Sequence, residues 1–209
     1  MLFTVQGQKH KFGSKLFPVA SKNRIAIFNN ENTVELDRNN PLIIELARQM
    51  DHFNYPMGYC YSNSYIIYKL AQDIGIEAAY YSGWLMYPEL MPIHHAWVVI
   101  NGNSVIDVGI NIEEFNAMQR ADRSNSFWKE KVAREIADIR KKEYAPSTYC
   151  VFGKVNTWNI LVGSPDEPEN AKRIFRDLTK KYPNHPSYAH KGQNMLGASE
   201  LQKMIYKHL

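Results

Sequence analysis

The sequence predicts an α+β fold in which a central helix packs on an antiparallel β-sheet and further helices flank this core. Apolar residues recur with helical spacing over residues 59–74, and residues 76–84, 93–100 and 104–108 have the composition of strands. Asn101-Gly102 separates the last two strand segments. This dipeptide is typical of a tight hairpin, so we expect these two strands to be antiparallel.

Length and composition are those of an ordinary globular protein. The chain has 209 residues, of which 44 % are hydrophobic and 22 % charged, and we expect a single domain over residues 1–209. We place its core at about residues 41–110 and a helical C-terminal appendage at about residues 165–209. The net charge of +4, from 25 basic and 21 acidic residues, is too weak to indicate a nucleic-acid partner.

Targeting signals and cysteine content favour a cytoplasmic location. Residues 1–10 lack a basic stretch followed by an apolar one, so no signal peptide is predicted. Nowhere do about eighteen apolar residues follow one another, so no membrane span is predicted. The two cysteines, Cys60 and Cys150, exclude a disulfide scaffold and allow one bridge at most.

The N-terminal half contains further segments with recognisable turn signals. Residues 24–28 and 33–36 flank residues 29–32, Asn-Asn-Glu-Asn, and are expected to form a hairpin. Asn40-Pro41 is a helix start, followed at helical spacing by four apolar residues, Leu42, Leu46, Met50 and Phe53. The next helix is expected to end at Gly75, and residues 85–92 to form a loop bounded by prolines.

The C-terminal half mixes helical and strand patterns. A helix is predicted over residues 127–140, β structure over 149–162 and a linker-like break over 164–168. Helices are expected again around residues 171–181 and from about residue 198. The chain after Glu169 carries eight Lys or Arg against two acidic residues, which we interpret as a solvated helix face rather than a binding patch.

Cys60 lies at the first turn of the predicted helix 59–74, two residues after Gly58. Unpaired N–H groups and the helix dipole at that end favour a thiolate over a thiol. Helical steps from Cys60 reach one continuous face, formed by Ser64, Ile67, Ala71 and Ile74. Since the other faces are apolar too, we expect a helix buried on all sides with Cys60 at its tip.

His95 and Asp107 lie on the two predicted hairpin strands and can complete a catalytic triad with Cys60. A nucleophilic cysteine needs an imidazole to take its proton, and the imidazole needs a carboxylate or amide to hold its tautomer. A hairpin loop with an odd number of residues puts Asp107 opposite Trp97, on the same face as His95. A two-residue loop would put Asp107 on the wrong face, so the triad predicts an odd loop or a bulge.

These motifs resemble the transglutaminase-like superfamily, which belongs to the papain-like cysteine-enzyme fold. The resemblance covers about a quarter of the chain and is carried by Gly58-Tyr59-Cys60, Ile74-Gly75-Ile76, His95-Ala96-Trp97 and Val105-Ile106-Asp107. It implies a nucleophilic cysteine on the central helix, the histidine on one strand and the aspartate on the adjacent antiparallel strand. One departure is visible, because Val108-Gly109 follows the aspartate where the family often has Pro or Thr.

An oxyanion formed by thiolate attack needs two hydrogen-bond donors. The backbone N–H of Cys60 is the natural first donor. Asn54, six residues upstream, is a candidate for the second, and Tyr55 or Trp84 are alternatives. Asn54 is equally well interpreted as a cap of the preceding helix.

The other conspicuous side chains have structural interpretations. Trp97 is expected to pack beneath the site, His94 to point away from it, and Cys150 to be a core residue. Cys60, His95 and Asp107 as zinc ligands are a weaker alternative, because no closely spaced ligand pair supports a metal site. No calcium-loop pattern is present, and thioester chemistry needs no cofactor.

The sequence therefore predicts a cysteine hydrolase or acyltransferase acting on amide or peptide carbonyls, with a protein or peptide as substrate. A glutamine side chain or another amide would fit this chemistry. Transfer of the acyl group to water would make the protein a peptidase or deamidase, and transfer to an amine a transglutaminase. The alternatives are a transglutaminase-like binding module without activity and an acyl carrier similar to arylamine N-acetyltransferases, which expect a different motif around the cysteine.

Overall fold

The computed structural model shows a mixed fold of helices and a curled antiparallel sheet. It describes residues 2–5, 8–11, 24–55, 59–87, 90–108, 146–155 and 159–181, together with Lys131, Arg134, Glu135 and Asp138. Those four residues are helical and lie within the helix predicted over residues 127–140, the rest of which is outside the described residues. The helix predicted from about residue 198 is outside them as well.

Six strands form one sheet in the order β3–β8–β4–β5–β6–β7, with every neighbouring pair antiparallel. The strands are β3 (Ala26–Phe28), β4 (Ala78–Tyr87), β5 (Leu90–Ile100), β6 (Ser104–Asp107), β7 (Val151–Gly153) and β8 (Ile160–Pro165). A separate pair is formed by β1 (Leu2–Val5) and β2 (Gln8–Lys11). The α+β class and the antiparallel sheet predicted from the sequence are confirmed.

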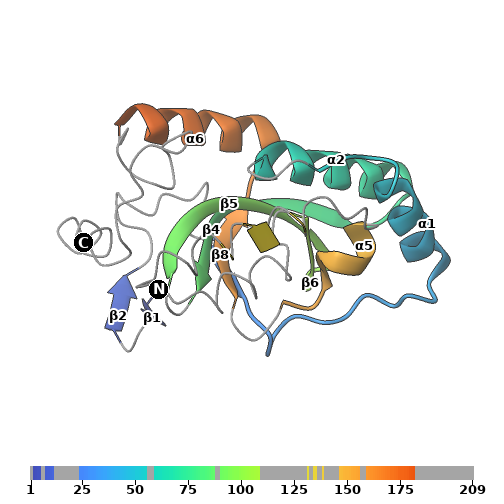
Figure 1. The fold of residues 1–209 in the computed structure, drawn as a ribbon, viewed down its shortest axis with the longest axis horizontal. Coiled ribbons are helices and arrows are strands. Elements are labelled where there is room, and N and C mark those ends of the chain that lie inside the picture. The colour runs from blue at the N-terminus through green and yellow to red at the C-terminus, as the bar shows by residue number, and fades with distance from the viewer. Residues whose placement is uncertain are drawn as a thin grey trace.

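Helices α1 (Pro41–Met50), α2 (Cys60–Asp73) and α6 (Pro168–Lys181) follow one another along the outer side of the arch formed by β5 (Figure 1). The start predicted for α1 is confirmed, because the Asn40 side chain accepts a hydrogen bond from the backbone N–H of Leu42 and Pro41 takes the first helical position. A short helix, α5 (Pro146–Tyr149), precedes β7.

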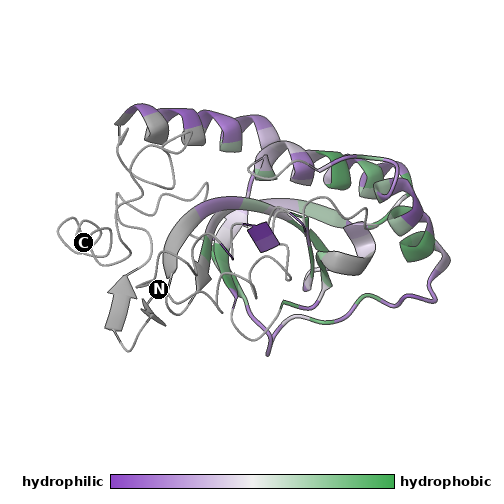
Figure 2. Ribbon diagram, viewed as in Figure 1, coloured by the Kyte–Doolittle hydropathy of each residue, from purple (hydrophilic) through white to green (hydrophobic). Residues whose placement is uncertain are grey.

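The sheet has apolar side chains on both faces, because strand residues alternate between the faces. The face toward α1 and α2 carries Val98, Ile100 and Ile106, which pack with Ile67 and Ala71 of α2. The opposite face is enclosed by a second cluster, comprising Phe28, Leu85, Trp97, Val99, Val105, Val151, Val155 and Leu161. Helix α6 is largely hydrophilic (Figure 2).

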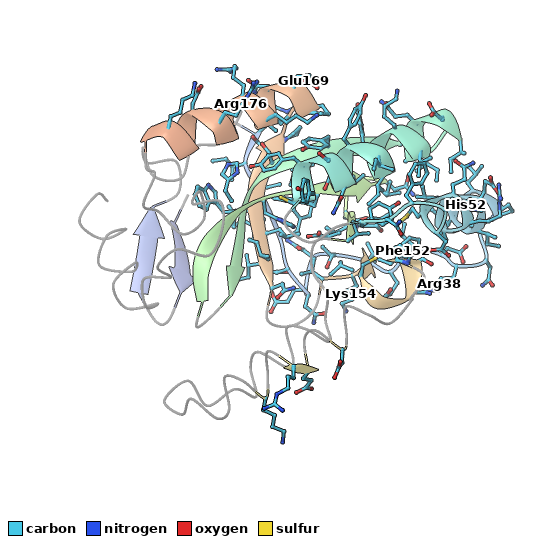
Figure 3. All side chains as sticks on the ribbon, turned by 45° about the horizontal axis from the view of Figure 1, so that its top comes forward. Arg38, His52, Phe152, Lys154, Glu169 and Arg176 are labelled. Atoms are coloured by element: carbon cyan, nitrogen blue, oxygen red, sulfur yellow. The ribbon has the colours of Figure 1, made fainter. Side chains whose placement is uncertain are left out.

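The hairpin expected between residues 24–28 and 33–36 is wrong. β3 pairs with β8, which is more than a hundred residues away in the chain, and residues 33–37 form no strand. The Asn29 side chain accepts hydrogen bonds from the backbone of Glu31 and Asn32, and this turn sends the chain toward β6 and β7. There the guanidinium of Arg38 lies 5.5 Å above the ring of Phe152 in β7 (Figure 3).

Three further boundaries differ from the sequence prediction. The loop expected over residues 85–92 is shorter, because β4 continues to Tyr87 and β5 begins at Leu90. The break expected over 164–168 is also shorter, since Ser164 and Pro165 belong to β8, an inner strand, and α6 begins at Pro168. The first helix ends at Met50, and its buried residues are Ile43, Leu46 and Met50, while Leu42 and Phe53 are exposed.

Candidate active site

Cys60 is the first residue of α2 and is partly exposed. Tyr59 before it is exposed and makes no side-chain cap, and the first turn contains no acidic residue. The first N–H groups of a helix have no intrahelical acceptor. Together with the helix dipole they favour negative charge at this end of α2.

The tip of α2 is fixed to the sheet by hydrogen bonds from both directions. The Ser64 hydroxyl donates to the backbone carbonyl of Ala96 in β5 at 2.9 Å. The Tyr80 hydroxyl in β4 donates to the carbonyl of Tyr61 at 3.3 Å. The predicted inner face of the helix is confirmed, because Ser64, Ile67 and Ala71 are buried.

The prediction of a helix buried on all sides is wrong. In α2 the residues on the outer side are exposed, among them Ser62, Tyr65, Lys69 and Gln72. The helix has the sheet on one side, and α6 contacts it only in part, with Lys172 Nζ lying 5.4 Å from the centroid of the exposed Tyr65 ring. Its apolar tyrosines misled the prediction, since a tyrosine can present its hydroxyl to solvent while its ring packs on a neighbour.

His95 and Asp107 form a buried pair on neighbouring strands. His95 Nε2 donates to Asp107 Oδ2 at 2.6 Å, and both side chains are almost fully buried. The odd hairpin loop predicted from parity is confirmed, since Asn101, Gly102 and Asn103 separate the paired residues Ile100 and Ser104. Asn101 and Gly102 both have positive φ angles, of 50° and 83°, which these two residue types adopt readily.

Cys60 lies near His95, since its charge and a side-chain hydrogen bond to it raise the pKa of the imidazole. Nε2 is taken by Asp107, which leaves Nδ1 as the ring nitrogen for the sulfur. β6 ends at Asp107, so among the described residues β5 has no strand partner on that side at His95. The first turn of α2 reaches the imidazole at this open edge.

The surroundings of His95 favour the imidazolium. Burial alone would lower the pKa of His95, but the charges of Asp107 and Cys60 and their hydrogen bonds raise it, to about 10. At neutral pH the ring is therefore protonated between two acidic partners. A thiolate beside an imidazolium is the reactive form of a cysteine nucleophile.

Trp97 packs against the imidazole as expected. Its indole ring stacks on His95 with centroids 6.2 Å apart and 19° between the planes. Gly163 leaves room for the indole, because a Cβ there would lie 2.6 Å from Trp97 Cη2. Gly83 allows a close approach of β4 to β8, because a Cβ there would collide with the backbone of β8. These glycines were not predicted, although strand register places Gly83 directly opposite His95.

His94 faces the other side of the sheet, as predicted, and meets Tyr61. Their rings stack with centroids 5.7 Å apart, and the Tyr61 hydroxyl is hydrogen bonded to His94 Nδ1. Trp84 lies edge-on against the same imidazole at 5.0 Å. Burial, followed by the charge of His95, lowers the pKa of His94 to about 3, so this ring is neutral.

The structure places the remaining candidates as follows. Asn54 is exposed, and no described hydrogen bond joins it to Cys60 or His95. Tyr55 is half-buried and packs against the apolar cluster between α1 and α2. Trp84 lies beside His94, on the sheet face opposite His95. Gly58 lies outside the described residues.

Cys150 is a core residue, as predicted. It is buried, and its S–H donates to the backbone carbonyl of Pro146. Burial raises the pKa of its thiol above the ordinary value, and the charge of Asp107 raises it further. Cys150 therefore lacks the helix-start position and the neighbouring imidazole of Cys60.

Among the described residues, no group of three or more His, Cys, Asp or Glu side chains is arranged to hold a metal ion. None of the helices in the described part of the chain is long and apolar enough to span a membrane. Searches of protein-family models, of curated proteins and of solved structures found no match to the chain.

Proposed function

We propose that the chain is a cysteine-dependent enzyme with a transglutaminase-like, papain-type core, acting on amide or peptide carbonyls through a thioester. The observation that carries this proposal is the hydrogen-bonded series from Cys60 through His95 to Asp107. Its members lie on a helix start, a strand and the adjacent antiparallel strand, in that order along the chain. Nucleophile, base and orienting carboxylate thus each have a partner within hydrogen-bonding reach.

In the first half-reaction the Cys60 thiolate attacks the amide carbon, and the carbonyl electron pair moves to oxygen. The N–H groups at the start of α2 stabilise this oxyanion, with the backbone N–H of Cys60 as the first donor. His95 then gives its proton to the leaving nitrogen as the carbon–nitrogen bond breaks. An amine or ammonia leaves, and the acyl group remains on Cys60 as a thioester beside a neutral His95.

In the second half-reaction His95 takes a proton from water or from an amine as that molecule attacks the thioester. The carbon–sulfur bond breaks, and the thiolate and imidazolium are restored. Asp107 holds Nδ1 toward the sulfur in both steps and stabilises the charged ring. Hydrolysis and amine transfer differ only in which acceptor reaches the thioester, and no cofactor takes part.

The substrate we propose is a protein or peptide that presents a glutamine side chain or another amide. Partial exposure of Cys60 and exposure of Tyr59 beside it support access from solvent at the tip of α2. A reducing, cytoplasmic location fits a mechanism that requires a free thiol, and both Cys60 and Cys150 are free.

The test is alkylation of the full chain by iodoacetamide at pH 6, with Cys60 and Cys150 followed separately by peptide mass spectrometry. Cys60 should react at least about a hundredfold faster than Cys150, and His95→Gln should abolish most of this difference. A glutamine-containing protein incubated with a fluorescent primary amine then separates amine incorporation from ammonia release. The Cys60→Ser variant serves as the inactive control, and Cys150→Ser as the matched control that keeps activity.

Equal, slow labelling of Cys60 and Cys150 would contradict the enzyme and favour a transglutaminase-like binding module. Fast labelling of Cys60 that persists unchanged in His95→Gln would contradict the role of His95, since the imidazole could then not be what activates the sulfur.

A further inference from the structure

Two neighbouring residues of β5 contact two neighbouring residues of α2. His95 is hydrogen bonded to Cys60, and His94 is stacked on and hydrogen bonded to Tyr61. Because strand residues alternate, the two histidines reach the helix tip from opposite faces of β5. The helix tip is therefore held at two adjacent points, of which only one belongs to the proposed chemistry.

We propose that His94 is a positioning residue, which through its contact with Tyr61 sets the place of the Cys60 sulfur against the His95 imidazole. The proposal rests on the proposed function of Cys60 and concerns how its geometry is maintained. The described contacts of His94 are with Tyr61 and Trp84. Its effect passes through the Tyr61 side chain to the backbone of the first turn of α2.

The His94 ring is itself rigidly held, as a positioning residue requires. Trp84 packs edge-on against it at 5.0 Å, and Tyr61 stacks on it with only 15° between the planes. The backbone carbonyl of Tyr61 accepts a hydrogen bond from the buried Tyr80 hydroxyl. Tyr61 is thus fixed at its ring by His94 and at its backbone by Tyr80, and it leaves Cys60 little freedom to move.

The charge state of His94 suits this role. A neutral imidazole offers an unprotonated Nδ1, which accepts the hydrogen bond that the Tyr61 hydroxyl donates. A second imidazolium next to His95 would compete with it for the negative charges of Cys60 and Asp107. A neutral ring on the far face leaves His95 as the charged group at the sulfur.

The test compares alkylation of Cys60 at pH 6 in Tyr61→Phe, His94→Phe and the double variant. Each single change removes one partner of the hydrogen bond and keeps an aromatic ring. We expect each to slow alkylation by about tenfold or more, because displacements of about 1 Å at a reacting atom can cost a hundredfold. The double variant should be no slower than either single one, since both remove the same interaction.

Two further variants separate positioning from general packing. His94→Asn places an amide oxygen near the position of Nδ1, and should recover part of the rate that His94→Phe loses. Tyr68→Phe removes a hydroxyl from the same helix whose described hydrogen bond comes from the exposed Gln72 Nε2, and should leave the rate within about twofold of the wild type. In a turnover assay Tyr61→Phe should lower kcat and leave KM unchanged, because substrate binding is untouched.

The outcomes also distinguish this inference from the proposed function. Wild-type rates in both Tyr61→Phe and His94→Phe, with a slow His95→Gln, would overturn the role of His94 and leave the enzyme proposal standing. Slow alkylation of Cys60 in the wild type would overturn both the role of His94 and the enzyme proposal. If His94→Phe unfolds, shown by loss of the near-ultraviolet circular dichroism, Tyr61→Phe decides alone, since it removes one oxygen atom.

Discussion

Cys60 and Cys150 lie at opposite ends of helices and show how environment separates two identical side chains. Cys60 begins α2, where the helix dipole is positive, and it contacts an imidazole. Cys150 directly follows α5, is buried, and donates its S–H to the carbonyl of Pro146. Burial, with a contribution from Asp107, raises the pKa of the Cys150 thiol, so it stays protonated.

Asp107 links the two regions. It is hydrogen bonded to His95 on one side, and on β7 its partner in the ladder is Val151, the residue next to Cys150. One carboxylate therefore supports the charged imidazole beside Cys60 and opposes ionisation of Cys150. The difference between the cysteines depends on partners and helix ends rather than on burial alone.

We expect Asp107→Asn to have the largest effect on the difference in reactivity between Cys60 and Cys150. The amide keeps the volume and part of the hydrogen bond to His95 but removes the charge that stabilises the imidazolium. We expect turnover to fall by about 10²- to 10⁴-fold and alkylation of Cys60 to slow. Cys150 loses one of the charges that raise its pKa yet stays buried, so the ratio of the two alkylation rates should shrink.

Circular dichroism and the unfolding midpoint provide the control for this variant, because an isosteric change at a buried pair should leave the fold intact. Full turnover with an unchanged ratio of alkylation rates would reduce the site to a dyad of Cys60 and His95. Asp107 would then be a structural residue.

Gly163→Ala should have the next largest effect on the reactivity of Cys60, because the added methyl group crowds its neighbours. The added methyl group would lie 2.4 Å from the carbonyl oxygen of Ser82 and 2.6 Å from Trp97 Cη2. The Ser82 backbone cannot move away easily, so Trp97 must shift beside His95, at a cost of about 1–3 kcal/mol in the free energy of unfolding. Urea unfolding should show this loss, and alkylation of native Cys60 should slow.

Gly102→Ala is the matched control for crowding. Nothing lies within 4 Å of its added methyl group, but the φ of 83° is unfavourable for alanine. It should cost stability through the backbone alone and leave Cys60 at its wild-type rate in the folded protein. Equal slowing of Cys60 alkylation in Gly163→Ala and Gly102→Ala would show that a shift of Trp97 is not what slows the reaction.

Acid should leave the reactivity difference between Cys60 and Cys150 least affected, and should act on the stability of the fold. The pKa of His94 is lowered to about 3, first by burial and then by the charge of His95, whereas an unfolded chain has the ordinary value near 6.5. Between these pH values the unfolded chain binds a proton that the folded one does not. Stability should therefore fall as pH falls below about 6.5, by up to about 1.4 kcal/mol per pH unit from this group.

Alkylation of Cys150 reports unfolding in this measurement of stability, since its buried thiol is alkylated only when the chain opens. Urea titrations between pH 7 and 4 should show a shallower loss of stability in His94→Asn than in the wild type. His52→Asn, which removes an exposed histidine at the end of α1, should leave the slope unchanged. Parallel slopes in all three proteins would contradict a neutral His94.

Local patterns in the sequence were sufficient for the hairpin and for α1 and α2. Asn40-Pro41 marks the start of α1, and the odd loop at Asn101-Gly102-Asn103 follows from the requirement that Asp107 and His95 share a face. The contact of His95 with Asp107 followed from the same reasoning. Chemistry and strand parity together constrain this part of the chain strongly.

Pairings between distant segments could not be predicted in this way. The pairing of β3 with β8 and the close approach of Gly83 and Gly163 depend on strands that meet only in the folded chain. The stack of Tyr61 on His94 was missed, although each lies next to a predicted triad member. Local periodicity carries no information on which element covers which face, and for the same reason the exposed side of α2 was mistaken for core.

The three-residue loop between β5 and β6 has a consequence for how this protein can vary over evolutionary time. Hairpin loops ordinarily accept insertions and deletions of any length, because their tips face solvent. Here a change of one residue would turn Asp107 to the other face of the sheet, whereas a change of two would restore it. Variants that keep the triad should therefore differ in this loop by even numbers of residues, or carry a bulge that corrects an odd one.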